Sequence, residues 1–260
     1  MRDYAQLVAR RTQGISSLPD LTLIYCGKTH RLPAGFIMHN PKNFQQNDRA
    51  QLEGLIREYP FATLMTHSAS GLEANHLPVL LCEKDGKAVL QAHIARANPL
   101  WKTLPDKSDV LVVFNGPNCY ISPNHYPTKQ ETGKAVPTWN YVVVHVKGVM
   151  SYIQDKDWLL AMINRLTDQH EAGQQRPWST ADAPEEFIQK MLPAIVGLEI
   201  EISAITGQWK LSQNQPERNR RGVVAGLSGE SGDQYRTIAE LVKSASQKQA
   251  ITPAITATEN

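Results

Sequence analysis

Four short apolar segments follow one another between residues 61 and 114, and they constrain the fold more than any other feature of the chain. They are "FATLMTH" (61–67), "LEANHLPVLL" (72–81), "AVLQAHIA" (88–95) and "DVLVVF" (109–114). Their branched and aromatic residues favour strands, and the loops "SASG" and "CEKDGK" have the length and turn residues of hairpins. Because hairpins join antiparallel strands, this order predicts a closed or split antiparallel barrel and not a parallel βαβ sheet.

Helical patterns come before and after these strands. The segment 47–60 has Asn47 or Asp48 as a helix cap and Pro60 as a stop, with Leu52, Leu55 and Ile56 in one apolar stripe. Further helices are predicted over 155–171, 183–195, 216–227 and 233–245, and further strands over 136–148 and 196–207. The predicted fold class is therefore mainly β with helical additions, α+β.

The segment "VPTWNYVVVHVKG" (136–148) has the composition of a strand but carries polar and aromatic side chains. With a period of two, Val142, Val144 and Val146 share one face, which we predict to be core. The opposite face carries Trp139, Tyr141, Val143, His145 and Lys147. This second face is too polar for a core, so the stretch from Thr138 to Tyr141 is predicted to line a cofactor or dimer wall.

Composition and motifs narrow the range of functions. A formal net charge of +2 over 260 residues gives no bulk argument for nucleic acid or an anionic membrane as a partner. Cys26, Cys82 and Cys119 form no CxxC pair, which predicts reduced thiols in a cytoplasmic protein. No apolar run approaches the roughly 18–20 residues of a membrane span. The sequence lacks GxGxxG, GxxxxGK[ST], GxSxG and HExxH, so none of the functions with those motifs is supported.

The first 37 residues differ from the rest because basic residues dominate them. We interpret residues 1–37 as an N-terminal extension, either flexible or preceding a natural start at Met38, with a targeting segment as the alternative. At the other end, residues 228–260 are predicted to hold a C-terminal helix and a frayed tail over roughly the last 12 residues. The main domain is predicted over residues 38–227.

Residues 96–102 have the pattern of a phosphate site. Arg96 ends a strand, and Asn98 followed by Pro99 favours the start of a short helix, with Lys102 one turn further on. Free helix N–H groups beside two cations favour an anion, so this segment is predicted to bind phosphate.

Polar residues also interrupt the apolar strands. His76, His93 and His145 each lie within a strand-like segment, and Asn75 precedes the first of them. Three such strands in one small barrel indicate a shared polar cleft. A zinc site built from the three histidines remains an alternative.

The Pro- and Gly-rich segment 116–137 is predicted to be a long functional loop. It carries the aromatic side chains of Tyr120 and Tyr126, and Trp139 follows just after it. It also carries the polar side chains of Ser122, Thr128 and Lys129, and Asn140 follows just after it. Aromatic faces beside orienting polar groups suit a planar ligand. A phosphate site, a polar strand wall and a planar-ligand loop together favour a flat phosphorylated cofactor, a description that FMN fits.

These arguments define one set of candidate residues. No catalytic set and no metal site are assigned. The candidate cofactor-binding residues are Asn75, His76, His93, Arg96, Asn98, Lys102, Ser122, Lys129, Thr138, Trp139 and Asn140.

Several longer motifs occur in order, among them "GLEANHLPVLL", "AHIARANPLWKTL", "VPTWNYVVVHVKG" and "GQWKLSQNQPERNRRGVVAGL". Over residues 38–227 the chain strongly resembles the PaiB-type family of FMN-binding, split-barrel negative transcriptional regulators. The resemblance implies a split β-barrel related to the pyridoxamine-phosphate oxidase barrels. It also implies a homodimer with flavin between the protomers, and a flavin phosphate held near Arg96 to Lys102.

Two positions depart from the pattern of that family. His125 stands where the family usually has a tryptophan, which weakens any ligand stacking at that position. Asn219 stands where the family usually has an acidic residue, so any salt bridge made there is lost.

The resemblance favours an FMN-binding regulator, and two other functions stay open. An FMN-dependent oxidoreductase would use the flavin for electron chemistry, with His93 and His145 as the best acid–base candidates. A haem protein would need a ligand such as His76 or His170. Direct DNA contact has little support, because Arg218, Arg220 and Arg221 lie on the first helix of a pair whose second helix is near neutral.

Overall fold

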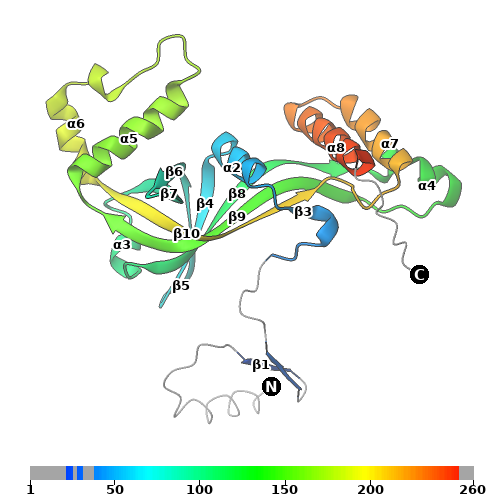
Figure 1. Ribbon diagram of the computed structural model, residues 1–260, viewed down its shortest axis with the longest axis horizontal. Helices are drawn as coiled ribbons and strands as arrows, with labels where there is room; N and C mark the ends of the chain where they lie inside the picture. The colour runs from blue at the N-terminus through cyan, green and yellow to red at the C-terminus, as the bar shows by residue number, and fades with distance from the viewer. Residues whose placement is uncertain (1–21, 26–27, 32–37, 252–260) are drawn as a thin grey trace. The chain divides into compact units, whose positions relative to one another are not determined.

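The computed structural model describes residues 22–25, 28–31 and 38–251, and the chain divides into two compact units, Met1–Asn40 and Pro41–Asn260 (Figure 1). In the first unit, β1 (Thr22–Tyr25) pairs with β2 (Lys28–Arg31) in an antiparallel hairpin. Most of the predicted extension and nearly all of the predicted frayed tail lie outside the described residues.

An antiparallel sheet organises the second unit. The strands follow the order β5-β4-β8-β9-β10-β7-β6, and the short β3 pairs with β10. This arrangement confirms the predicted α+β class with an antiparallel sheet. The strands are β3 (Gln45–Gln46), β4 (Phe61–Ser68), β5 (Gly71–Pro78), β6 (Leu80–Lys84), β7 (Lys87–Ala95), β8 (Ser108–Ile121), β9 (Thr138–Ile153) and β10 (Ile195–Lys210).

The two ends of the strand order are consecutive in the chain. Only Val79 separates β5 from β6, although these strands lie at opposite ends of the hydrogen-bonded order. The sheet must therefore curl until its ends meet, which makes it a barrel. The single strand predicted over 72–81 is in fact two strands with a bend at Val79, whose N–H donates to the carbonyl of Pro60 at 2.9 Å.

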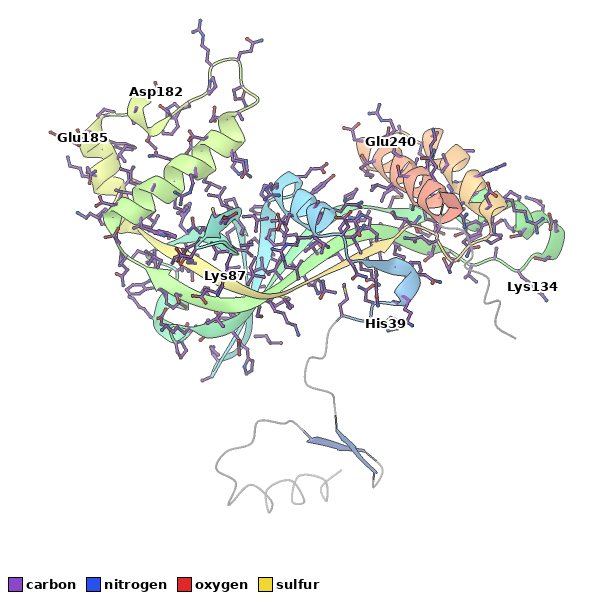
Figure 2. All side chains as sticks on the ribbon, in the orientation of Figure 1. His39, Lys87, Lys134, Asp182, Glu185 and Glu240 are labelled. Atoms are coloured by element: carbon purple, nitrogen blue, oxygen red, sulfur yellow. The ribbon has the colours of Figure 1, made fainter. Side chains whose placement is uncertain are left out.

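The prediction of a long loop over 116–137 is wrong for its first part. β8 continues to Ile121 and pairs with β9 up to Thr138. Gly116 and Pro117 do not end the strand, because the pairing shifts register between Asn115 and Asn118, and such a bulge accommodates both residues. The rest of the segment contains the 3-10 helix η2 (Pro123–His125) and α4 (Pro127–Thr132), and Lys134 follows them (Figure 2).

The barrel interior is apolar, as the alternation in β9 predicts. Val142, Val144 and Val146 are buried, with exposed fractions of 2% or less. They share one cluster with Leu64, Phe114 and many other residues of the barrel strands. The face of β9 predicted to be core is thereby confirmed.

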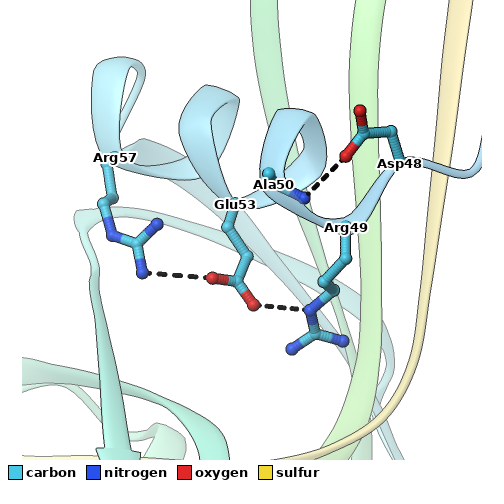
Figure 3. A network of polar contacts seen from close by, with 5 residues as sticks. All are labelled: Asp48, Arg49, Ala50, Glu53 and Arg57. Carbon is cyan, nitrogen blue, oxygen red and sulfur yellow. Dashed lines mark hydrogen bonds and ion pairs between the residues drawn. The ribbon is translucent and has the colours of Figure 1, made fainter.

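Helix α2 (Arg49–Glu58) packs on this core through Leu52, Leu55 and Ile56, the predicted stripe. Asp48 caps it, since its carboxylate accepts from the N–H of Ala50 at 3.0 Å (Figure 3). Glu53 accepts from Arg49 and Arg57, one turn away on either side (Figure 3). These hydrogen bonds outweigh burial and lower the pKa of Glu53.

A helical excursion connects β9 to β10. Asp155 caps α5, because its carboxylate accepts from the N–H of Trp158 at 2.8 Å. α5 covers the outer face of β7 and β10, where Trp158 lies against Gly197 so closely that a Cβ there would be 2.4 Å from the indole. The excursion contains α5 (Lys156–Glu171), η3 (Thr180–Asp182), α6 (Glu185–Met191) and η4 (Leu192–Ala194), with Asp182 and Glu185 labelled in Figure 2.

Two helices form a second core at the other end of the long strands. Val223 and Leu227 of α7 pack with Ile238 and Val242 of α8 against Ile121 of β8. Figure 1 shows this pair far along β8 and β9 from α5 and α6. The remaining helices are η1 (Lys42–Phe44), α3 (Leu100–Thr103), α7 (Glu217–Ser228) and α8 (Asp233–Ile251).

The close approach of β9 and β10 generates a stability prediction. A Cβ at Gly148 would lie 2.4 Å from the carbonyl oxygen of Glu201, a backbone atom that has little freedom to move. We expect Gly148→Ala to lower the free energy of unfolding by about 2 kcal/mol, a usual cost of overpacking. Gly173→Ala is the control, because nothing lies within 4 Å of its Cβ. Urea denaturation measures both, and equal stability of the two variants would contradict the packing described for β9 and β10.

Candidate functional site

The predicted phosphate site lies at the corner between β7 and α3. The side-chain carbonyl of Asn98 accepts from the N–H of Leu100 at 2.9 Å, so Asn98 caps α3 as predicted. Its amide nitrogen donates to the side chain of Asn75 at 2.7 Å. β5 and the β7–α3 turn thus bring two of the candidate residues together.

Arg96 occupies the same corner and binds three neutral acceptors. Its guanidinium donates to the carbonyl of Pro193 at 2.5 Å, to the side chain of Gln154 at 2.9 Å and to the carbonyl of Ile195 at 3.1 Å. Gln154 directly follows β9, and the other two acceptors lie where the chain returns to β10. Arg96 therefore fastens both ends of the α5–α6 excursion to the end of β7.

Trp101 holds two cations at this corner. The Cζ atom of Arg96 lies 5.4 Å from the centre of the indole and the Nζ atom of Lys102 lies 5.1 Å from it. The indole N–H donates to the carbonyl of Arg96 at 2.8 Å, which fixes the ring. Within the described part of the chain, no carboxylate forms an ion pair with Arg96 or Lys102. Two neighbouring cations without a counterion fit a phosphate group.

The outer face of the barrel carries His76 and His145. The register aligns His76, Thr63, Val113 and His145 across β5, β4, β8 and β9. The next row contains Ala74, Met65, Leu111 and Lys147. His76 also shares a hydrogen bond of 3.1 Å with Thr63 and stacks on Phe61. Because adjacent strand residues point to opposite faces, His76 and Asn75 do not face the same space.

His93 lies away from this face, under α5. It is opposite Gly197 in the register, the residue on which Trp158 packs. Its Nδ1 atom is buried with no hydrogen-bond partner, and burial lowers the pKa of the imidazole. A neighbouring polar cluster anchors α5, since Arg165 donates to Gln91 at 2.7 Å and Gln91 donates to the buried Glu199 at 2.9 Å.

The three strand histidines do not form the alternative zinc site. His76 and His145 are three strand-to-strand spacings apart, from β5 across β4 and β8 to β9, which at about 4.8 Å each is roughly 14 Å. His93 is on β7 under α5. Among the described residues, no group of three or more His, Cys, Asp or Glu side chains is arranged to hold a metal.

The candidate residues of the segment after β8 make local contacts. The side-chain oxygen of Ser122 accepts from the N–H of Asn124 at 3.2 Å, and Lys129 donates to the side chain of Asn124. The side chain of Thr138 accepts from Lys210 at 2.7 Å. Asn140 is fully buried, and its amide exchanges hydrogen bonds with the hydroxyl of Ser212 at 3.0 and 3.2 Å.

Trp139 contributes to an aromatic groove at the bulge of β8. It is 51% exposed and packs edge to face against Tyr120. A groove of about 300 Å3 runs beside it, lined by Asn115, Gly116, Asn118, Trp139, Tyr141, Val142 and Val143. We did not identify Asn115 and Asn118 from the sequence. The Gly-Pro pair within "FNGPNCYI" is the sequence feature that indicates these two residues, because it marks the bulge that opens the groove.

Apart from His76 and His93, the candidate residues thus form two separate clusters near the ends of β9. The α3 corner lies beside Ile153 and Gln154, whereas Trp139 and Thr138 begin the strand. β9 has 16 residues, which at about 3.3 Å each extend roughly 50 Å. A single chain does not bring the phosphate corner and the aromatic groove to one ligand.

Comparison with known sequences assigns the chain to a family. The family described as "Putative FMN-binding domain" matches residues 38–204, which contain all the candidate residues. The chain belongs to this family. FMN is the cofactor that the description names, and the matched region ends before α7 and α8 of this family member.

Relatives extend over most of the chain. "Protease synthase and sporulation protein PAI 2" of Bacillus subtilis is 31% identical over 212 residues, which cover 82% of this chain and 100% of the relative. An uncharacterized protein of Saccharomyces cerevisiae, YKL070W, is 36% identical over 160 residues, covering 54% of this chain and 93% of the relative. The solved structure of the FAD and Heme binding protein from Mycobacterium smegmatis is similar with 16% identity and a TM-score of 0.47, covering 70% and 80% of the two chains.

The two departures from the PaiB-type pattern have structural explanations. The His125 ring lies on Gly226 of α7, where a Cβ would be 2.4 Å from the imidazole. His125 therefore packs α7 against η2. Asn219 is buried and donates to the hydroxyl of Thr128 at 3.0 Å and to the side chain of Gln215 at 3.0 Å, so hydrogen bonds hold this position. Arg218 still links α7 to α4, because it pairs with Glu131 at 2.8 Å.

The histidines considered for haem are both exposed. His76 stacks on Phe61, itself 68% exposed, and His170 lies on the solvent side of α5.

No helix among the described residues of this family member is long and apolar enough to cross a membrane.

The burial of His93 predicts a pH dependence of stability. Because burial lowers its pKa from the ordinary 6.5, the unfolded chain binds more protons than the folded one below about pH 6.5. The contribution of neutral, buried His93 to the free energy of unfolding is fully present above that pH and is lost as the pH falls. We expect His93→Phe to reduce the loss of unfolding free energy between pH 7 and pH 5, measured by urea denaturation. His145→Gln is the comparison, since burial and Lys147 lower the pKa of His145 too. An unchanged slope in His93→Phe would contradict this assignment.

Proposed function

We propose that this protein binds FMN and acts, as a homodimer, in PaiB-type negative control of gene expression. The observation that carries the proposal is the family match over residues 38–204. The α3 corner supports it independently, because two cations there form no ion pair with a carboxylate of the described residues. The chemistry of the corner thus agrees with the phosphate of the cofactor named by the family.

Arg96 and Lys102 would bind the flavin phosphate, with Trp101 keeping the two cations in place. Asn98 and Asn75 would orient the corner through their mutual hydrogen bond. The aromatic groove beside Trp139 would receive the ring system, whose flat faces suit aromatic walls. When bound, the flavin supplies the capacity for reversible electron transfer.

The separation of these two clusters supports a homodimer. FMN is far shorter than the roughly 50 Å of β9 between them, so both clusters contact one flavin only if they come from different protomers. The outer face supplies the surface for such a contact. Leu72, Phe61 and Met65 on this face are 75%, 68% and 37% exposed, and apolar patches of this kind mark interaction sites.

The dimer proposal predicts the effect of a charge on the outer face. We expect Leu72→Glu to weaken dimerisation at least tenfold, because it places a carboxylate in the apolar contact. Analytical ultracentrifugation over a concentration series measures this change. Trp178→Glu is the control, since Trp178 is 44% exposed but lies between α5 and η3, outside the sheet and outside both flavin clusters. A monomer in the unaltered protein, or equal dimerisation of the two variants, would count against the proposal.

The regulatory part of the proposal rests on the resemblance to the PaiB-type family and on the relative from Bacillus subtilis, which is named as a protease synthase and sporulation protein. We do not include direct DNA contact, because Arg218, Arg220 and Arg221 lie on α7, the first helix of the pair, and α8, the second helix, is near neutral. A cytoplasmic location agrees with Cys82 and Cys119, which are both free thiols.

The phosphate corner predicts which flavins bind. We expect Lys102→Gln to weaken FMN binding about tenfold, the loss of one charge-assisted contact, and to leave riboflavin binding unchanged. Trp139→Ala should weaken the binding of FMN and of riboflavin by the same factor, because Trp139 would pack on the flavin ring, and should leave the fold largely intact, because Trp139 is half exposed. Quenching of flavin fluorescence measures all four affinities.

Controls distinguish a wrong assignment of the binding residues from a failure of flavin binding itself. Lys134→Gln removes an exposed lysine that lies outside both clusters and should bind like the unaltered protein. Failure of the unaltered protein to bind any flavin would reject the proposed function itself. Consumption of NAD(P)H by the FMN-loaded protein would favour the oxidoreductase alternative, although α5 covers His93, one of its two acid–base candidates.

A further inference from the structure

A groove of about 450 Å3 opens between α7 and α8, beyond the residues that match the FMN-binding family. Its volume lies in the usual range for small-molecule sites, about 300–1,000 Å3. Three cationic side chains line it, with a single carboxylate, over two small apolar residues. The residues that carry the argument are Arg220, Arg221, Lys243, Glu217, Val224 and Ala225.

The groove exists because the two helices pack through other residues. Val223 and Leu227 of α7 and Ile238 and Val242 of α8 are fully buried in the core beneath them. On the groove side, Val224 and Ala225 are too small to fill the space between the helices. The floor of the groove is therefore apolar and its walls are polar.

Arg220 is held in place from two sides. Its Nε donates to the hydroxyl of Ser246 at 3.0 Å and its Nη1 donates to the carbonyl of Gln215 at 2.8 Å. Both acceptors are neutral, so they orient the guanidinium without neutralising it. A guanidinium has five N–H donors, and the two used here leave three for a ligand.

The other charges of the groove do not cancel this positive charge. Lys243 forms no ion pair with any carboxylate in the described part of the chain. Arg221 pairs with Glu217, but these side chains are 79% and 62% exposed, and such pairs contribute little. Glu240 belongs to α8 (Figure 2) but does not line the groove.

We propose that this groove binds a small organic carboxylate. The planar guanidinium of Arg220 matches the two oxygens of a carboxylate, and Lys243 adds a second charge. Val224 and Ala225 would contact the apolar body of the ligand. Only an anion that carries a small apolar group would contact both the cationic side chains and the apolar floor of the groove. The proposal does not depend on flavin binding, because the groove lies outside the two flavin clusters.

Three probes separate the contributions to binding. Benzoate carries the charge and the apolar ring, benzyl alcohol carries the ring alone, and inorganic phosphate carries charge alone. We expect saturable binding of benzoate to the full-length protein by isothermal titration calorimetry, at least tenfold tighter than either of the other two. NMR chemical-shift mapping should place the largest changes at residues of α7 and α8.

Variants test the residues of the groove. We expect Lys243→Gln and Arg220→Gln each to weaken benzoate binding at least fivefold, with FMN binding unchanged. Lys190→Gln, which removes an exposed lysine from α6, is the matched control. Lys243 is exposed and forms no hydrogen bond with the described residues, so this variant tests the proposal even if Arg220→Gln does not fold.

Three results would overturn the proposal. The first is benzyl alcohol or phosphate binding as tightly as benzoate, because the groove would then not recognise an organic carboxylate. The second is Lys243→Gln binding benzoate as tightly as Lys190→Gln does. The third is binding of a DNA duplex that depends on Lys243 together with no saturable binding of benzoate, which would make the groove part of a nucleic-acid surface.

Discussion

The barrel depends on a single turn of the chain at Val79. β5 and β6 lie at opposite ends of the hydrogen-bonded order but are joined by this one residue, so the sheet closes as soon as both strands pair with their neighbours. This closure sets the position of the barrel core. It makes one face of β8 and β9 a core and the other an outer surface. It also brings Asn75 of β5 within hydrogen-bonding distance of Asn98 after β7.

Local patterns in the sequence predicted the elements well because those elements depend on local forces. The alternation of Val142, Val144 and Val146 fixes which face of β9 is buried, and the short polar side chains of Asp48 and Asn98 determine where α2 and α3 begin. The extension of β8 through Gly116 and Pro117 was missed, because these residues favour a loop unless a partner strand tolerates a bulge. That partner, β9, is more than 20 residues further along the chain.

The candidate site was predictable only as separate pieces. The sequence identified the cations at 96 and 102 and the aromatic segment around Trp139, since spacing along the chain reveals each of them. It did not reveal that 16 residues of extended strand keep these pieces apart. The partners of Arg96, namely Gln154, Pro193 and Ile195, were equally hidden, because they are distant in sequence and two of them contribute only a backbone carbonyl.

The contacts of Arg96 connect the phosphate corner to the α5–α6 excursion. Three of its five N–H donors bind Gln154, Pro193 and Ile195, and the other two have no acceptor among the residues that the structure describes. An anion that uses the remaining donors leaves the other three contacts intact. Because all three acceptors are neutral, the positive charge of Arg96 stays available to that anion. The same guanidinium can therefore hold the α5–α6 excursion in place and bind a phosphate at the same time.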